Sequence, residues 1–143
     1  MQILSRHDLL HKQHFGIQMV PAEPYHGCSA FTNEDLLKNS VVLVDRGGCS
    51  FLTKTLNIQQ AGGIAAIIAD NDKENFEAYV DMIQDGTERP VTIPALFLLG
   101  KDGFMIRKSL EKAKLLSAVI NIPVNITGVP SMRLNQPPWT FCL

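Results

Sequence analysis

The sequence predicts a single α/β domain. At 143 residues, of which 45% are apolar, the chain is long enough for one well-buried core and too short for two ordinary domains. Two apolar runs, VVLVD and GIAAIIAD, flank a segment whose apolar residues repeat at helical spacing. A strand, a helix and a second strand with short connections are typical of a right-handed βαβ unit with parallel strands, which defines the class.

The N-terminal part of the chain carries weaker signals. Residues 1–20 are poorly patterned, and we expect a short helix over DLLHKQHF followed by a strand over GIQMV. The segment PAEPYHGCSAFTNEDLLKN is rich in turn-forming residues, so we expect a long loop there. This loop leads into VVLVD, which its β-branched content marks as a buried strand.

The helix of the βαβ unit begins after Ser50. Phe51, Thr55 and Ile58 repeat at helical spacing, and the Ser50 side chain can cap the first turn. The glycine pair at 62–63 ends this helix, because glycine accepts the left-handed conformation that closes a helix. The buried strand GIAAIIAD follows at once.

The second half of the chain adds a strand, a helix and an alternating strand. IPALFLL predicts a third apolar strand, after which Asp102 can cap a helix over GFMIRKSLEKAKLL. AVINIPVNIT then alternates between apolar and polar residues, and Pro123 makes it an edge strand or a bulge. We expect the proline-containing tail that follows not to continue the sheet.

Composition excludes several classes of function. The net charge of −1 gives no electrostatic reason to expect nucleic acid as a partner, and no apolar run is long enough to span a bilayer. Basic residues of the segment 101–114 are interspersed with acids, so we expect an exposed face there rather than a membrane-binding one. The first residues lack the apolar region of a signal peptide, so either the protein is not secreted or its signal is absent from this chain.

The segment Arg-Gly-Gly-Cys-Ser at 46–50, here called the RGG corner, resembles a ligand-binding turn. A phosphate-binding P-loop needs a Lys-Ser/Thr pair after its last glycine, and the dinucleotide fingerprint needs G-x-G-x-x-G; neither is present. Backbone amides at the helix start could still accept an anion. We favour a tight strand-to-helix turn that uses glycine for its positive φ.

Two roles are open to Cys49. A helix N-terminus lowers the pKa of a thiol, so this cysteine could be a nucleophile. A cysteine hydrolase also needs a positioned base, and all four histidines lie upstream without a recognisable context. The alternative is a disulfide with Cys28, which would close a loop of about 20 residues and contribute roughly 3 kcal/mol. We favour the disulfide, which leaves Cys142 as a spare thiol.

Two segments resemble metal sites. His7, His11 and His14 would share one face of a helix, and three imidazoles can hold zinc, but no acid or cysteine completes the set at comparable spacing. The run DNDKE at 70–74 resembles the start of a calcium loop, although the sixth position is asparagine and the twelfth is aspartate. We therefore predict no metal ion and no cofactor.

Asn125 begins an N-glycosylation sequon, Asn-Ile-Thr. A sequon alone is a weak signal, but the strand pattern puts Asn125 on the polar face near a strand end. The sequon matters only if the chain enters the secretory pathway.

Taken together, these segments resemble the protease-associated domain family. VVLVDRGGCSFLTKTLNIQQAGGIAAIIADN, followed by IPALFLLGKDGFMIRKSL, has the family's pattern of an apolar strand, Arg-Gly-x-Cys-x-Phe, a Lys-bearing helix, Ala-Gly-Gly and a second apolar strand. The resemblance implies an α/β domain over residues 20–128, with a β-sandwich or open β-barrel core flanked by two or three helices. Residues 1–19 are poorly matched, and residues 129–143 form a tail with proline and aromatic residues.

The resemblance also implies a function. Domains of this family have no catalytic residues of their own and are thought to bind peptides or proteins, and the likeness here is to small secreted glycoproteins made of little else. We therefore predict a secreted, non-catalytic module with a Cys28–Cys49 disulfide and a glycan on Asn125. Its partner would be an unknown protein or peptide, met on loops and the exposed sheet edge. The alternative is a small enzyme that uses Cys49 or the RGG corner as a reactive or anion site. Trp139 and Phe141 are expected to cover the body.

Overall fold

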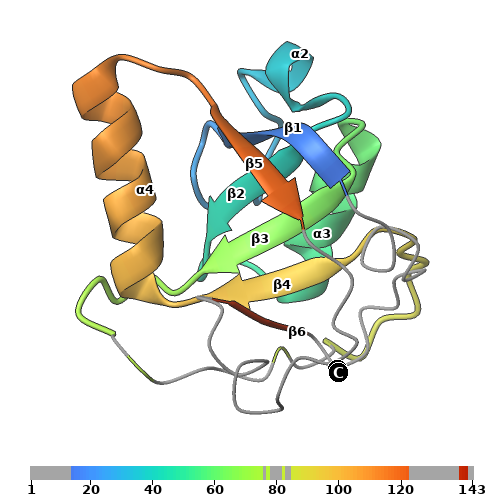
Figure 1. Ribbon diagram of the computed structural model, residues 1–143. Coiled ribbons are helices and arrows are strands. Elements are labelled where there is room, and N and C mark those ends of the chain that lie inside the picture. Colours follow the sequence, from blue (N-terminus) through green and yellow to red (C-terminus); the bar gives the residue numbers. More distant parts are fainter. Residues whose placement is uncertain (1–13, 76, 78–81, 83–84, 123–138, 142–143) are drawn as a thin grey trace, which may run out of the picture.

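The computed structural model describes residues 14–75, 77, 82, 85–122 and 139–141. These residues form a mixed sheet with helices on both faces (Figure 1). In chain order the elements are β1 (His14–Pro21), α2 (Glu34–Leu37), β2 (Val41–Asp45), α3 (Phe51–Gln60), β3 (Ala65–Ala69), β4 (Ala95–Leu98), α4 (Gly100–Ala113), β5 (Ala118–Ile122) and β6 (Trp139–Phe141).

The sheet has four parallel strands at its centre and an antiparallel strand at each edge. β1, β2, β3 and β4 each pair in parallel with the next, while β5 pairs antiparallel with β1 and β6 with β4. The predicted βαβ unit is confirmed as β2–α3–β3, in which Val41 lies level with Ala65. The α/β class and the flanking helices are confirmed. The described strands form one open sheet in the order β5-β1-β2-β3-β4-β6, and not two stacked sheets.

Both faces of the central strands are buried. Val42 and Val44 point to the face covered by α3, where Ile58 packs against them. Val41 and Leu43 point to the opposite face, which α4 covers (Figure 1). Parallel strands between helices are buried on both sides and therefore read as continuous apolar runs, which is why the sequence predicted these strands well.

Several element boundaries differ from the sequence-based expectation. α2 lies within the segment expected to be a loop, and β1 already begins at His14, within the expected helix. α4 begins at Gly100 with Leu99 as its N-cap residue, and no side chain caps it. The prediction that Asp102 caps this helix was wrong, because the helix starts at Gly100, three residues earlier than predicted, and Asp102 lies inside its first turn.

The expectation that the tail cannot continue the sheet was also wrong. β6 pairs antiparallel with β4, with Phe141 level with Leu96 and Trp139 level with Leu98. Pro138 is the last proline of the tail, so the three residues of β6 keep the backbone N–H groups that a strand needs. Their side chains lie outside what the structure describes, so the prediction that Trp139 and Phe141 cover the body stays a prediction.

Candidate functional site

The RGG corner is a tight turn between β2 and α3. Gly47 and Gly48 have φ angles of 101° and 85°, a backbone region that residues other than glycine rarely adopt. Ser50 is the N-cap of α3, and its Oγ accepts a hydrogen bond of 3.0 Å from the backbone N–H of Thr53. The corner therefore has the glycine-dependent turn geometry that the sequence favoured.

Cys49 is joined to Cys28 by a disulfide, with a Cα–Cα distance of 5.8 Å. The bond links the RGG corner to the loop that follows β1. A Cβ built on Gly48 would lie 3.2 Å from the Cys28 Sγ, so the loop packs closely on the corner. In this state Cys49 has no thiol to act as a nucleophile.

Lys54 fixes the same corner from inside the protein. Its side chain is fully buried, and its Nζ donates hydrogen bonds to the backbone carbonyls of His26 and Gly47 and lies 3.5 Å from the Cys28 Sγ. Burial lowers the pKa of Lys54, and the nearby charge of Asp45 opposes that shift. Sequence reasoning gave Lys54 no role, because a lysine in an amphipathic helix normally faces solvent.

An open hollow of about 720 Å³ lies beside the RGG corner. Its lining includes Tyr25, His26, Asp45, Arg46 and Asn71, and we call it the corner hollow. Asp45 ends β2 and Asn71 follows the end of β3, so the hollow lies at the carboxyl ends of the parallel strands. Open parallel α/β sheets bind their ligands at the carboxyl ends of their strands.

Arginines pair with the carboxylates at the carboxyl ends of the parallel strands. Arg107 of α4 forms an ion pair with Asp45, and its guanidinium carbon lies 4.3 Å from the centroid of the Tyr25 ring. Arg46 lies 3.7 Å from the buried carboxylate of Asp70. The Nε and Nη2 of Arg107 are buried and find no hydrogen-bond partner among the described residues. The two ion pairs balance the charges beside the hollow. The sequence did not reveal the pair between Arg107 and Asp45, because these residues are 62 positions apart in the chain.

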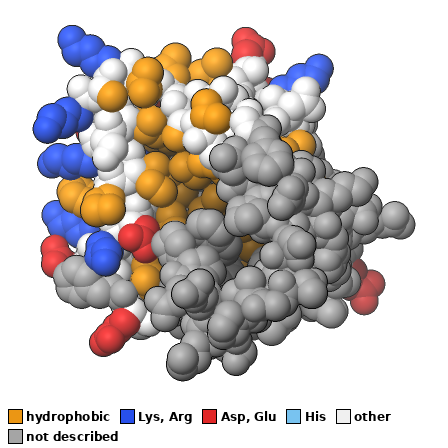
Figure 2. Space-filling model, viewed as in Figure 1, with side chains coloured by type: hydrophobic (Ala, Val, Ile, Leu, Met, Phe, Trp, Pro, Cys, Tyr) orange, Lys and Arg blue, Asp and Glu red, His pale blue; other side chains and the backbone are white. Residues whose placement is uncertain are grey.

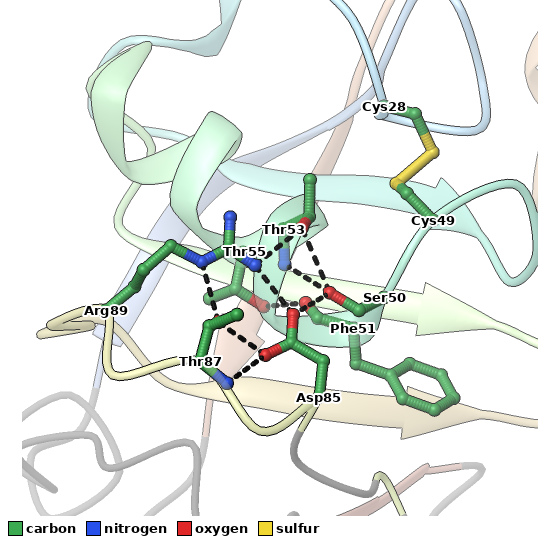
Figure 3. Close-up of polar contacts among 9 residues, drawn as sticks. All are labelled: Cys28, Cys49, Ser50, Phe51, Thr53, Thr55, Asp85, Thr87 and Arg89. Atoms are coloured by element: carbon green, nitrogen blue, oxygen red, sulfur yellow. Dashed lines mark hydrogen bonds and ion pairs between the residues drawn. A yellow bond between two sulfur atoms is a disulfide. The ribbon is translucent and has the colours of Figure 1, made fainter.

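A second polar cluster holds the loop at 85–89 against the start of α3 (Figure 3). Asp85 accepts hydrogen bonds from the Ser50 hydroxyl at 2.5 Å and from the backbone N–H of Thr87 at 3.0 Å, and it forms a 2.6 Å ion pair with Arg89. The hydrogen bond from Ser50 is the main reason that the pKa of Asp85 is lowered. Figure 3 also shows the disulfide on the neighbouring Cys49, so this cluster and the disulfide hold two sides of one helix start.

The segments that resembled metal sites form no such cluster where they are described. Asp70 accepts hydrogen bonds from the Asp72 backbone N–H and the Asn75 side chain, and Asp72 accepts one from the Glu74 backbone N–H. Within the described residues, no group of three His, Cys, Asp or Glu side chains could hold a metal ion. His14 lies in β1 rather than in a helix.

Several predicted residues lie outside the described part of the chain. They are His7, His11, Asn125 and Cys142. Among the described helices, none combines the length and the apolar character needed to cross a membrane.

Comparison with known proteins identifies the family. The model of the PA domain matches residues 17–106, which contain the RGG corner, both cysteines of the disulfide and Lys54. The chain belongs to the PA domain family. This confirms the resemblance that the strand–corner–helix pattern indicated.

Relatives carry the domain in proteins of different kinds. The chain is 45% identical over 126 residues to the PRADC1-like protein of Drosophila melanogaster, covering 87% of this chain and 64% of that protein. It is 34% identical over 121 residues to ER degradation-enhancing alpha-mannosidase-like protein 3 of Xenopus laevis, covering 82% of this chain and 13% of that protein. It is 29% identical over 134 residues to Vacuolar-sorting receptor 7 of Arabidopsis thaliana, covering 87% and 21%. The chain thus spans less than two thirds of the length of these relatives.

A solved structure shares the fold. The aminopeptidase from Aneurinibacillus sp. strain AM-1 matches with a TM-score of 0.53 and 17% sequence identity, covering 78% of this chain and 27% of that one. At this identity the likeness concerns the fold alone.

Proposed function

We propose that this chain is a secreted, non-catalytic glycoprotein module, with its domain over residues 20–128, whose corner hollow binds an extended segment of a partner protein. One observation carries the proposal: the hollow lies at the carboxyl ends of the parallel strands, where open α/β sheets bind ligands, and beside a corner whose only cysteine is held in a disulfide. The site therefore offers recognition without a nucleophile.

The chemistry of the hollow favours binding over catalysis. Asp45 and Asp70, the carboxylates at the carboxyl ends of these strands, are each paired with an arginine of this chain. The relative named as a mannosidase-like protein matches this chain over only 13% of its own length. Such a proportion fits a domain that accompanies a catalytic unit.

The exposed groups of the hollow suit a peptide. Tyr25 is partly exposed and offers a ring and a hydroxyl, Arg46 offers a guanidinium, and Asn71 offers an amide. These groups hydrogen-bond to backbone amides and carboxylates, and one aromatic side chain can cover a residue of the ligand. A volume of about 720 Å³ is within the range of pockets that hold small ligands or a few residues of a peptide.

The disulfide and the relatives support entry into the secretory pathway. Disulfides persist in oxidising compartments and are rare in the cytosol. Two relatives are named for the ER and for vacuolar sorting, compartments of that pathway. In this setting the sequon at Asn125 would be glycosylated.

Selection from a displayed library of random peptides tests binding at the hollow. We expect peptides that bind the wild-type protein and Lys38→Gln but lose at least about tenfold in affinity for Arg46→Gln and for Asn71→Ala. Lys38 is the matched control, because it is exposed and precedes β2 at the opposite end of the sheet. Selected peptides that bind all four proteins equally would contradict the corner hollow as the site, and a library without binders would contradict the binding function.

Intact mass tests secretion, glycosylation and the disulfide. The protein should be secreted from animal cells behind a supplied signal, lose mass on glycosidase treatment, and take up alkylating reagent at one thiol without reduction. An Asn125→Gln variant should lack the glycan. An unglycosylated chain with three alkylated thiols would contradict these assignments and return Cys49 as a reactive residue.

A further inference from the structure

A second surface lies on the face of the sheet that carries α4, where an apolar groove runs between α4 and the edge strand β5. We propose that this surface, here called the β5 groove, docks an extended segment of a partner protein that pairs with β5 and carries apolar residues flanked by acids. The inference rests on the proposed binding function, but the β5 groove shares no lining residue with the corner hollow.

The groove is apolar along its length. It has a volume of about 320 Å³, and its lining includes Met105 and Ile106 of α4, Met19 of β1, and Ala118 and Ile120 of β5. Figure 2 shows hydrophobic side chains gathered in the hollow beside α4. The two methionines can adapt their flexible side chains to different apolar residues of a ligand.

Apolar exposure extends beyond the groove itself. Met105 is 57% exposed, and Leu115 and Leu116, which connect α4 to β5, are 57% and 69% exposed. Contiguous apolar surface of this kind marks interaction sites in soluble proteins.

Within the described part of the chain, the edge strand β5 has one side that no other strand covers. In the described sheet β5 pairs with β1 on one side, and no described strand pairs with its other side. Edge strands commonly carry lysine or proline that prevents further pairing; the five residues of β5, Ala-Val-Ile-Asn-Ile, have neither, and Pro123 follows directly after the strand. An extended partner can therefore add a strand here, with main-chain hydrogen bonds for affinity and the groove for alternate side chains.

Charge determines which partner fits. Three exposed lysines of α4 border the groove: Lys101, Lys108 and Lys112. They lie four residues before Met105, three residues after it and seven residues after it, respectively. These spacings place them on the same side of the helix as Met105. Figure 2 shows Lys and Arg side chains along the outer side of this helix, with Asp and Glu side chains beside them. α4 also carries Asp102 in its first turn and Glu111 near its C-terminal end. Glu111 lies six residues after Met105 and is therefore off the stripe that carries the lysines. Acidic residues beside the apolar segment of a ligand would meet this lysine rim.

The same rim argues against a second copy of this chain as the occupant. Two copies paired through β5 about a two-fold axis perpendicular to the sheet would present their α4 helices on the same face. The two lysine rims would then border one joint surface, and like charges across an interface are unfavourable. An acidic segment has no such penalty.

The test uses the full chain and a synthetic peptide of alternating valine and threonine with glutamates at both ends. We expect the peptide to bind, to slow amide hydrogen exchange within residues 118–122, and to bind less well as salt increases. The same peptide with lysines in place of the glutamates is the control ligand and should not bind. The double variant Lys108→Glu with Lys112→Glu should weaken binding of the glutamate peptide about tenfold, and Lys38→Glu should leave it unchanged.

Each other outcome overturns the proposal. Equal binding of both peptides, or binding without protection of β5, would show that neither the acids nor strand addition matters. Concentration-dependent dimers that protect β5 and are lost in Val119→Lys would identify a second copy as the occupant. Arg46→Gln separates the two surfaces: it should leave binding of the glutamate peptide unchanged, so failure at the corner hollow and failure at the β5 groove are measured independently.

Discussion

Replacing Lys54 by methionine tests whether the buried ammonium organises the RGG corner. Methionine keeps most of the apolar stem of lysine but has no donor for the carbonyls of His26 and Gly47. A buried carbonyl without a partner costs about 1–3 kcal/mol, so two cost about 2–6 kcal/mol. Removing the ammonium also removes the cost of burying a charge, which acts in the opposite direction. We expect a net loss of ~2 kcal/mol.

Urea unfolding measures this loss. With a slope of about 2 kcal/mol per molar urea, the midpoint should fall by about 1 M in Lys54→Met, while the exposed-site control Lys38→Met should stay within ~0.2 M of wild type. An unchanged midpoint in Lys54→Met would refute the reasoning, because it would mean that the carbonyls are satisfied by water or that the corner rearranges without penalty.

The pH dependence supplies an independent check. The pKa of Lys54 is lowered in the folded protein from its ordinary value of 10.5. Between the folded pKa and 10.5 the unfolded chain binds a proton that the folded chain does not, so stability from this group rises with pH in that window. The advantage of wild type over Lys54→Met should therefore grow as the pH approaches 10.5. A constant difference between the two proteins would contradict the lowered pKa.

Four further variants have expected outcomes. The double variant Cys28→Ser with Cys49→Ser, which opens a loop with a sequence separation of 21, should lose about 3 kcal/mol in urea unfolding. Gly100→Ala should cost about 3 kcal/mol, because its Cβ would lie 1.7 Å from a backbone oxygen of the loop after β3. Gly86→Ala, which has positive φ but open space, should cost about 1 kcal/mol, and thermal unfolding compares the two. Asp85→Asn should lower the thermal midpoint slightly at neutral pH. Because the pKa of Asp85 is lowered in the folded protein, the ionised carboxylate stabilises the fold above its ordinary pKa, and this stabilisation is lost as the pH falls below about 4. The variant should therefore lose less stability than wild type on acidification.

These variants have clear contrary results. A disulfide-free protein as stable as wild type would mean that the bond adds no constraint to the unfolded chain. Equal costs at Gly100 and Gly86 would contradict the close approach of α4 to the loop after β3. An unchanged acid limb in Asp85→Asn would mean that the cluster with Ser50 does not stabilise the fold.

The sequence predicted the centre of the sheet and the edge strand β5, but it missed the edge strand β6. β2, β3 and β4 are continuous apolar runs because both of their faces are buried, so composition alone identifies them. β6 is three residues long and follows two prolines, so no local signal separates it from a tail. It exists as a strand because β4 offers it an edge, which is a tertiary effect that periodicity cannot register.

The candidate site was predicted in part for a similar reason. The turn at Gly47 and Gly48 follows from local backbone chemistry, which sequence motifs encode. Lys54 and Arg107 have functions that depend on where distant carbonyls and carboxylates lie in the folded chain. A buried lysine inside an amphipathic helix looks like an exposed one until the loop that covers it is known.

The corner hollow is organised before any ligand arrives. Three segments far apart in the sequence meet at this edge: the loop after β1, the RGG corner and the middle of α4. The disulfide joins the first two, Lys54 binds carbonyls of both, and Arg107 ties α4 to Asp45 while it stacks on Tyr25. A surface fixed in this way loses little conformational entropy on binding, so even a few peptide contacts can produce measurable affinity. The disulfide that removes Cys49 from thiol chemistry is thus also part of the rigid framework on which the proposed peptide binding depends.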